Sequence, residues 1–128
     1  MHNVPNVAGV AVVTGAARGI GLAVARQFLA QGYRVALLDI DAVTLAATRA
    51  NLDDDLRVLA IECDVAIPQQ VQSAIDQVAA HFGRIDALVN NAGIAIFKPI
   101  LDIRVEEWSR VLAVNLDGPF LCTQAAAR

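Results

Sequence analysis

The sequence predicts an α/β fold with a doubly wound parallel sheet, incomplete in this chain, whose visible strand order is 3-2-1-4. Two patterns lead to this prediction. Apolar runs of strand length alternate with helical patterns along the 128 residues, without a linker, repeat or low-complexity segment. The run at residues 34–39 is also continuously apolar between its ends, as a strand covered on both faces requires. We expect one domain over residues 1–128.

The expected strands are short and rich in Val, Leu, Ile and Ala. They cover residues 7–14, 34–39, 56–61 and 85–90. Because helices separate them, the strands should run parallel through right-handed crossovers. In this order the fourth strand is an unpaired hydrophobic edge, which proteins usually avoid.

The first two helices are expected directly after the first two strands. A helix over residues 19–31 should end at Gly32. Its expected sheet-facing residues, at four-residue spacing, are Ile20, Val24 and Phe28. Asp41 can cap a second helix over residues 42–51.

Three further helical regions follow. Pro68 stands where the first turn of a helix tolerates proline, and Gly83 ends that helix. Its core-facing stripe is Val71, Ile75, Val78 and Phe82. Residues 105–112 and 115 onward are also expected to be helical, with a bend at Gly118-Pro119.

The composition excludes several classes of partner. The chain is 56% hydrophobic and 18% charged, with a formal net charge of −3. This mild acidity argues against nucleic acid or an anionic membrane surface as partner. No apolar stretch approaches the roughly 20 residues that span a bilayer, and residues 1–6 lack a signal-peptide pattern. We therefore expect a cytoplasmic protein without membrane contact.

The cysteines and histidines indicate neither a disulfide nor a metal site. Cys63 and Cys122 form no Cys-x-x-Cys pair, so we expect two buried free thiols in a reducing compartment. His2 and His81 do not have metal-ligand spacing, and we expect no metal.

The most informative motif is a glycine-rich turn after the first apolar run, Thr14-Gly15-Ala16-Ala17-Arg18-Gly19-Ile20-Gly21. Glycine permits a sharp turn and the close approach of a ligand. The helix that follows offers free N–H groups and the positive end of its dipole to a phosphate. No Lys-Ser or Lys-Thr follows, so a P-loop for nucleotide triphosphates fits poorly. A tight connection without a ligand is the structural alternative.

Thr-Gly-x3-Gly-x-Gly at the first strand–helix turn resembles the short-chain dehydrogenase/reductase family, NAD(P)-dependent oxidoreductases on a Rossmann-type sheet. Further matches occur in the family's order at Asp39, Asp64, Asn90-Asn91-Ala92-Gly93 and Asn115, so the resemblance covers about residues 7–128. It implies hydride transfer between NAD and a small-molecule alcohol or carbonyl substrate. The cofactor-binding residues that it implies are Gly15, Arg18, Gly19, Ile20, Gly21, Asp39, Ile40, Cys63, Asp64, Val65, Asn91, Ala92, Gly93 and Val114.

Asp39 ends the second strand, about 20 residues past the glycine turn, where a carboxylate can accept hydrogen bonds from a ribose diol. A helix cap or solvated turn residue is its alternative role. A 2′-phosphate about 4 Å from a carboxylate costs up to about 4 kcal/mol at an effective dielectric near 20. Arg18 opposes this preference, because a basic residue in the glycine turn can pair with that phosphate. We favour NAD over NADP.

The resemblance gives two more roles near the strand ends. Asp64 would accept a hydrogen bond from the adenine amino group, or cap the Pro68 helix, or both. Small residues at Asn91-Ala92-Gly93 let the nicotinamide-ribose half of a cofactor approach the fourth strand. The asparagine side chains can also tie neighbouring strands together, and a purely structural Asn91 remains open.

The resemblance assigns a catalytic role to one residue of this chain, Asn115, which matches the asparagine that supports a water in the family's proton relay. Trp108, in the preceding helix, is interpreted as core packing. The family also needs a Ser and a Tyr-x3-Lys pair, but Tyr33 and Lys98 are the chain's only tyrosine and lysine and are not so spaced. As given, the chain should therefore be inactive.

We expect the chain to be the N-terminal, cofactor-binding half of a longer enzyme. A sheet of six or more strands needs about 180 residues or more. The alternatives are a naturally short, non-enzymatic nucleotide-binding or sensor protein, and another Rossmann-like enzyme such as a nucleotide-sugar epimerase or methyltransferase. By resemblance, a homotetramer or homodimer is expected, associating through the helix that begins near Asn115.

Overall fold

The computed structural model describes residues 9–128, so residues 7 and 8 of the first expected strand lie outside the described part. One sheet of parallel strands has the order β3-β2-β1-β4, which confirms the predicted order. Its strands are β1 (Val10–Thr14), β2 (Arg34–Asp39), β3 (Val58–Glu62) and β4 (Ala87–Val89).

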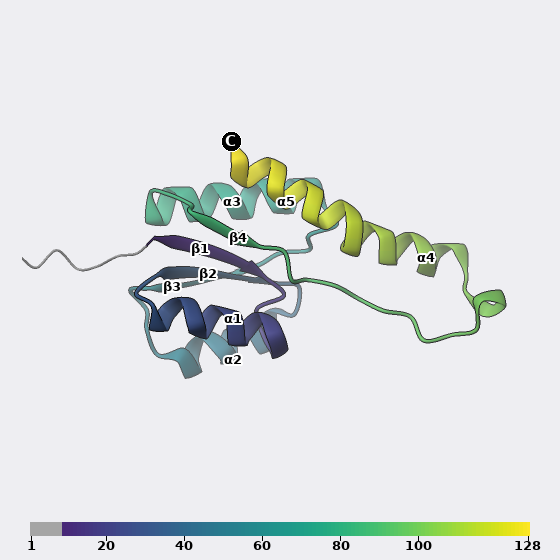
Figure 1. Cartoon of the computed structure of the whole chain (residues 1–128), viewed down its shortest axis with the longest axis horizontal. Helices are drawn as coiled ribbons and strands as arrows, with labels where there is room; N and C mark the ends of the chain where they lie inside the picture. The colour runs from purple at the N-terminus through teal and green to yellow at the C-terminus, as the bar shows by residue number, and fades with distance from the viewer. Residues whose placement is uncertain (1–8) are drawn as a thin grey trace, which may run out of the picture.

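Helices cover both faces of this sheet (Figure 1). One face carries α1 (Gly19–Ala30) and α2 (Ala42–Leu52), and the other carries α3 (Pro68–Phe82) and α5 (Gly118–Ala127). Two short elements and one further helix complete the chain: η1 (Ile100–Asp102), α4 (Val105–Leu112) and the π turn η2 (Ala113–Asp117). No helix within residues 9–128 has the length and apolar character needed to cross a membrane.

The core consists of two apolar layers, one on each side of the sheet. All five residues of β1 are buried, as are the four central residues of β2, which explains their unbroken apolar sequence. The stripe on α3 is buried as predicted, and Gly83 ends that helix at φ +82°. Asp41 caps α2, its side chain accepting a hydrogen bond from the Thr44 backbone nitrogen.

Several expectations about single elements were wrong. The third strand starts at Val58 rather than at residue 56, because a turn closed by Asp54 and Arg57 precedes it. The fourth strand is only Ala87–Val89, because it pairs on one side alone. Ile20 does not face the sheet but is 76% exposed, whereas Val24 and Phe28 pack against the core.

Two expectations about the last helices were also wrong. Trp108 is 56% exposed and does not pack in the core. Gly118 has ordinary helical dihedral angles, and the irregularity lies one turn earlier, in η2. Because Pro119 lacks an N–H and its ring crowds the preceding turn, the wider π turn accommodates it without a break.

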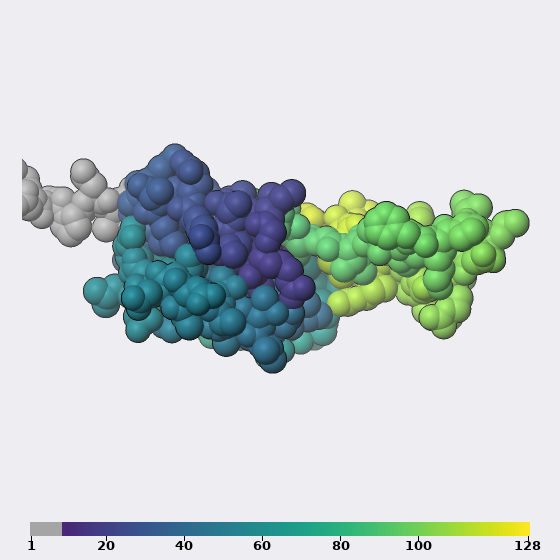
Figure 2. Space-filling model, turned by 90° about the horizontal axis from the view of Figure 1, so that it is seen from below, coloured from purple at the N-terminus to yellow at the C-terminus, as the bar shows by residue number. Residues whose placement is uncertain are grey.

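Residues 94–112 form an arm that extends beyond the sheet (Figures 1 and 2). The arm comprises the loop after β4, η1 and α4, and in Figure 2 its green segment projects from the body of the molecule. Its strongly exposed apolar side chains are Phe97, Ile100, Leu101, Val105 and Trp108. The arm begins just after the carboxyl end of β4. Most of the predicted site residues lie at this same edge of the sheet.

Candidate functional site

A cavity of about 360 Å³ lies at the carboxyl ends of the strands. It is lined by Gly15, Arg18, Ile20, Asp39, Ile40, Cys63, Asp64, Val65, Asn91, Ala92, Gly93, Ile94, Arg110 and Val114. The predicted cofactor-binding residues all line it except Gly19 and Gly21. Its volume is within the range of small-molecule sites, and its position is where doubly wound sheets bind ligands.

The glycine turn is packed tightly against the end of β4. Gly15 has φ +64°, and a Cβ added there would lie 2.9 Å from the Ala92 Cα. A Cβ at Gly21 would lie 2.2 Å from the Gly15 carbonyl oxygen. These two glycines therefore allow the turn, the first helical turn of α1 and the end of β4 to come together, which is a structural requirement before any ligand binds.

Thr14 and Asn91 hold the same region by hydrogen bonds. The buried Thr14 hydroxyl accepts from the Asn91 and Ala92 backbone nitrogens, both at 3.0 Å. The Asn91 side-chain nitrogen donates to the Gly15 carbonyl at 3.1 Å. These bonds confirm that an asparagine side chain ties neighbouring strand ends together, and they fix Asn91 and Ala92 at the wall of the cavity.

The Asp39 carboxylate is held by two backbone N–H groups. Its Oδ2 accepts from the Ala17 nitrogen at 2.9 Å, and its Oδ1 accepts from the Asp41 nitrogen at 2.9 Å. The carboxylate therefore fixes the glycine turn against the end of β2. A carboxylate oxygen has further lone pairs, so Asp39 can still accept hydrogen bonds from a ligand in the cavity.

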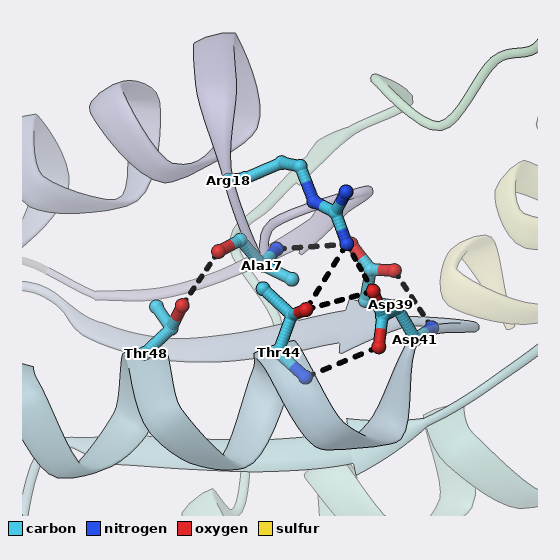
Figure 3. Close-up of polar contacts among 6 residues, drawn as sticks. All are labelled: Ala17, Arg18, Asp39, Asp41, Thr44 and Thr48. Atoms are coloured by element: carbon cyan, nitrogen blue, oxygen red, sulfur yellow. Dashed lines mark hydrogen bonds and ion pairs between the residues drawn. The ribbon is translucent and has the colours of Figure 1, made fainter.

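The Arg18 side chain binds the N-cap residue and the first turn of α2 rather than Asp39 (Figure 3). Its Nη2 pairs with the Asp41 Oδ2 and also donates to the Thr44 hydroxyl at 3.1 Å. Hydrogen bonds from the Thr44 nitrogen and hydroxyl, followed by the Arg18 charge, hold the pKa of Asp41 below its usual value. Asp41 is therefore ionised at neutral pH, and the pair persists there.

The second carboxylate of the cavity, Asp64, has one partner on its own turn and one on the arm. Its Oδ1 accepts from the Ala66 nitrogen at 3.0 Å, which forms a local turn, while the residue that caps α3 is Ile67. Its Oδ2 accepts from Arg110 Nη2 at 3.1 Å. The predicted capping role for Asp64 is thus replaced by a turn that precedes the helix.

Asn115 does not line the cavity but holds a residue that does, Ile94. Its side chain makes hydrogen bonds with the backbone of Ile94, the first residue of the arm. Two cavity residues, Ile94 and Arg110, were not among the predicted cofactor-binding residues, although the sequence placed the loop that begins at Ile94 beside the pocket. Ile94 directly follows the predicted motif and could have been included, but Arg110 lies 46 positions from its partner Asp64, and no local pattern links them.

The cysteines are buried and free, as predicted. Burial raises the pKa of Cys63 to about 12 and that of Cys122 to about 11. Both thiols are therefore protonated at neutral pH. Cys63 lines the cavity as a small apolar group rather than as a nucleophile.

The other polar residues considered above lie away from the cavity. Tyr33 precedes β2, at the opposite end of the sheet, with its ring centroid 4.8 Å from that of Phe28. Lys98 forms an ion pair with Glu107 on the arm. The serines Ser73 and Ser109 lie on α3 and α4.

The family of the chain follows from a comparison with known proteins. The model of the short chain dehydrogenase family matches residues 9–128. The chain belongs to the short-chain dehydrogenase family. It is 45% identical over 120 residues to D-threitol dehydrogenase of Mycolicibacterium smegmatis, an alignment covering 93% of this chain and 46% of that protein. The chain spans about half the length of most of the curated relatives it matches.

Solved structures of the family have the same architecture. A 3-ketoacyl-(acyl-carrier-protein) reductase from Brucella melitensis, complexed with NADH, superposes with a TM-score of 0.87 at 31% identity, covering 92% of this chain and 48% of that one. A blue fluorescent protein from a metagenomic library, complexed with NADPH, gives a TM-score of 0.87 at 34% identity, covering 97% and 52%. The Rossmann-type fold is thus shared, and both nicotinamide cofactors occur among these neighbours.

Proposed function

We propose that this chain is the cofactor-binding part of an NAD-dependent oxidoreductase that transfers a hydride between NAD and an alcohol or carbonyl substrate. The observation that carries the proposal is the cavity at the carboxyl ends of β1 to β4, around which the glycine turn, Asp39 and Asp64 converge. In a doubly wound sheet this is the place where the strand order reverses and dinucleotides bind.

The residues of the cavity fit an extended dinucleotide. A Cβ added at Gly19 would meet no atom within 4 Å, so the first turn of α1 is open to an approaching pyrophosphate. Asp39 would accept hydrogen bonds from the adenosine ribose, and Asp64 would accept one from the adenine amino group. The small residues Ala92 and Gly93 would leave room for the nicotinamide ribose.

Asp39 would also favour NAD over NADP. Its carboxylate is fixed at the cavity wall, so a 2′-phosphate at this position would meet a negative charge that cannot turn away. Such a contact at about 4 Å costs up to about 4 kcal/mol at an effective dielectric near 20.

When bound, NAD would supply the hydride acceptor or donor. The chain's own residues would orient it, and Asn115 would hold the backbone of Ile94 beside the nicotinamide side of the cavity. Residues 1–128 contain no Tyr-x3-Lys pair that could move the substrate proton. We therefore propose that these residues alone bind nucleotide but do not turn over substrate.

Calorimetric titration with NAD tests the site. Gly19 is a better position for a test substitution than Gly15, because a Gly15→Val side chain would collide with the Ala92 backbone and disturb the fold. Gly19→Ala should weaken NAD binding by about tenfold or more, since its methyl group occupies the ligand's approach.

Gly83→Ala is the matched control for this experiment. Gly83 has φ +82°, close to the +60° of Gly19, and its added Cβ also meets nothing within 4 Å. It lies at the end of α3, away from the cavity, whereas Gly19 stands between Arg18 and Ile20, which both line the cavity. Equal NAD affinity in the two variants, or no NAD binding by the parent protein, would contradict the proposed site.

Two further measurements address the proposed activity and assembly. An NAD-linked assay on residues 1–128, free of longer contaminants, should show no alcohol oxidation or carbonyl reduction. Light scattering of the intact protein should give a homodimer or homotetramer. The exposed apolar residues Leu116 and Phe120, on η2 and α5, support association through this helix.

A further inference from the structure

The wall of the cavity carries one positive side chain, Arg18, and one negative side chain, Asp39, at the glycine turn and the end of β2. Only the negative charge is available to a ligand. Arg18 and Asp39 both line the cavity. Asp39 is held by backbone N–H groups and, within residues 9–128, makes no ion pair. Its carboxylate is therefore not engaged in a salt bridge within the described residues.

The positive charge of Arg18 is already compensated. Its Nη2 binds the Asp41 carboxylate and the Thr44 hydroxyl at the start of α2, and neither of these residues lines the cavity (Figure 3). The Arg18 backbone is fixed as well, because the Ala17 carbonyl just before it accepts from the Thr48 hydroxyl at 2.5 Å. The guanidinium is thus held against α2 by groups outside the site.

We propose that Asp41 is a specificity-determining residue, which disfavours NADP by holding the Arg18 guanidinium against α2 and withholding it from a 2′-phosphate. The proposal rests on the proposed NAD-binding function and deepens it. Asp39 repels the 2′-phosphate directly, and Asp41 removes the cation that would otherwise offset this repulsion. Cofactor preference is then set by two carboxylates, one inside the cavity and one outside it.

The two oxygens of Asp41 have separate tasks, which makes the proposal testable without loss of the helix cap. Oδ1 accepts from the Thr44 backbone nitrogen at 3.1 Å and caps α2. Oδ2 binds Arg18 and accepts from the Thr44 hydroxyl at 2.7 Å. Asn caps helices as well as Asp, so Asp41→Asn retains the cap and loses the negative charge that holds Arg18.

The expected effect is modest, because the pair is partly exposed. The side chains of Arg18 and Asp41 are 65% and 36% exposed, and ion pairs of this kind are weak. Releasing Arg18 should therefore tighten NADP binding about fivefold, which corresponds to about 1 kcal/mol. Binding of NAD, which lacks the 2′-phosphate, should change by less than about twofold.

Calorimetric titration of the intact protein with NAD and NADP provides the test. Asp41→Asn should tighten NADP binding about fivefold, and the same substitution in an Arg18→Ala background should have no such effect. Asp55→Asn is the charge-matched control, because Asp55 pairs with Arg49 and does not line the cavity. It should leave both affinities unchanged.

Arg18→Ala alone tests the same point without touching the cap. If Arg18 is held by Asp41, its removal should cost about fivefold less NADP affinity in the parent protein than in the Asp41→Asn variant; an equal loss in the two backgrounds would overturn the proposal. An unchanged NADP-to-NAD ratio in Asp41→Asn, with normal NAD binding, would overturn it and leave the proposed function standing. A parent protein that binds neither dinucleotide would overturn both.

Discussion

The Asn115 amide pairs with the backbone of Ile94 in both directions. Its Oδ1 accepts from the Ile94 nitrogen at 2.8 Å, and its Nδ2 donates to the Ile94 carbonyl at 2.8 Å. One side chain in the π turn η2 thus imitates a strand neighbour for the first residue of the arm. The residue that resemblance assigns to catalysis also has a definite structural task.

Replacing Asn115 should loosen the start of the arm. Asn115→Leu removes both bonds, and at about 1 kcal/mol each the Ile94 amide, which donates one of them, should exchange at least about tenfold faster. Hydrogen exchange followed by NMR measures this. Asn90→Ala, which removes a bond to Thr123 outside this contact, is the control. Unchanged exchange in Asn115→Leu would mean that the amide does not hold the arm.

Thr14 should contribute to stability through its hydroxyl. Val has the same shape, so Thr14→Val leaves packing intact while the Ala92 nitrogen loses its hydrogen-bond acceptor in a buried site. The expected loss is about 1–3 kcal/mol in the free energy of unfolding, measured by urea denaturation. Thr14→Ser keeps the hydroxyl and should lose less; a Thr14→Val variant as stable as the parent protein would show that the hydroxyl contributes nothing.

The order of elements was predictable because apolar runs and punctuating residues are local signals. The ends were less so: Leu56 looked like strand, yet it is 86% exposed, because the Asp54–Arg57 turn precedes β3. Ile20 fits the helical period of α1 but belongs to the first turn, which faces the cavity rather than the sheet. Periodicity identifies a helix face without showing where the sheet beneath it ends.

Part of the candidate site was also predictable from the sequence, and part was not. Residues at the carboxyl ends of parallel strands meet at one edge, so Gly15, Asp39 and Asp64 could be grouped from sequence. The side-chain partners could not be predicted, because two acidic residues at and just after the end of the second strand, Asp39 and Asp41, were both possible partners for Arg18. Only the three-dimensional arrangement shows that Asp41, and not Asp39, takes its charge.

Glu107 should titrate far below an ordinary glutamate. Hydrogen bonds from Lys98, then from the Arg104 nitrogen, lower its pKa from 4.5 to about 2. Because the folded value lies below the unfolded one, the contact stabilises the arm fully above pH 4.5 and is lost as pH falls toward 2. Carboxyl NMR titration measures it. Lys98→Met should raise the pKa toward 4.5, whereas Lys98→Arg should keep it low.

The two thiols should resist alkylation in the folded protein. Burial raises the pKa of Cys63 to about 12 and that of Cys122 to about 11, so almost no thiolate exists at mildly alkaline pH. A thiol-reactive dye should label neither residue in the native state and both in guanidinium chloride. Rapid native labelling of Cys63 would instead indicate that the cavity wall opens.

The π turn η2 makes the side chains of α4 and α5 point in different directions around one continuous run of helix. An extra residue in a single turn changes the angular phase of everything beyond it by about 100°. In this way α5 directs Cys122 and Ala125 into the core against α3, while α4 directs Arg110 to Asp64 at the cavity rim. Deleting one residue of η2 would keep every other side chain and yet turn α4 away from the rim. Evolution can therefore tune that rim through the length of this turn as well as through its composition.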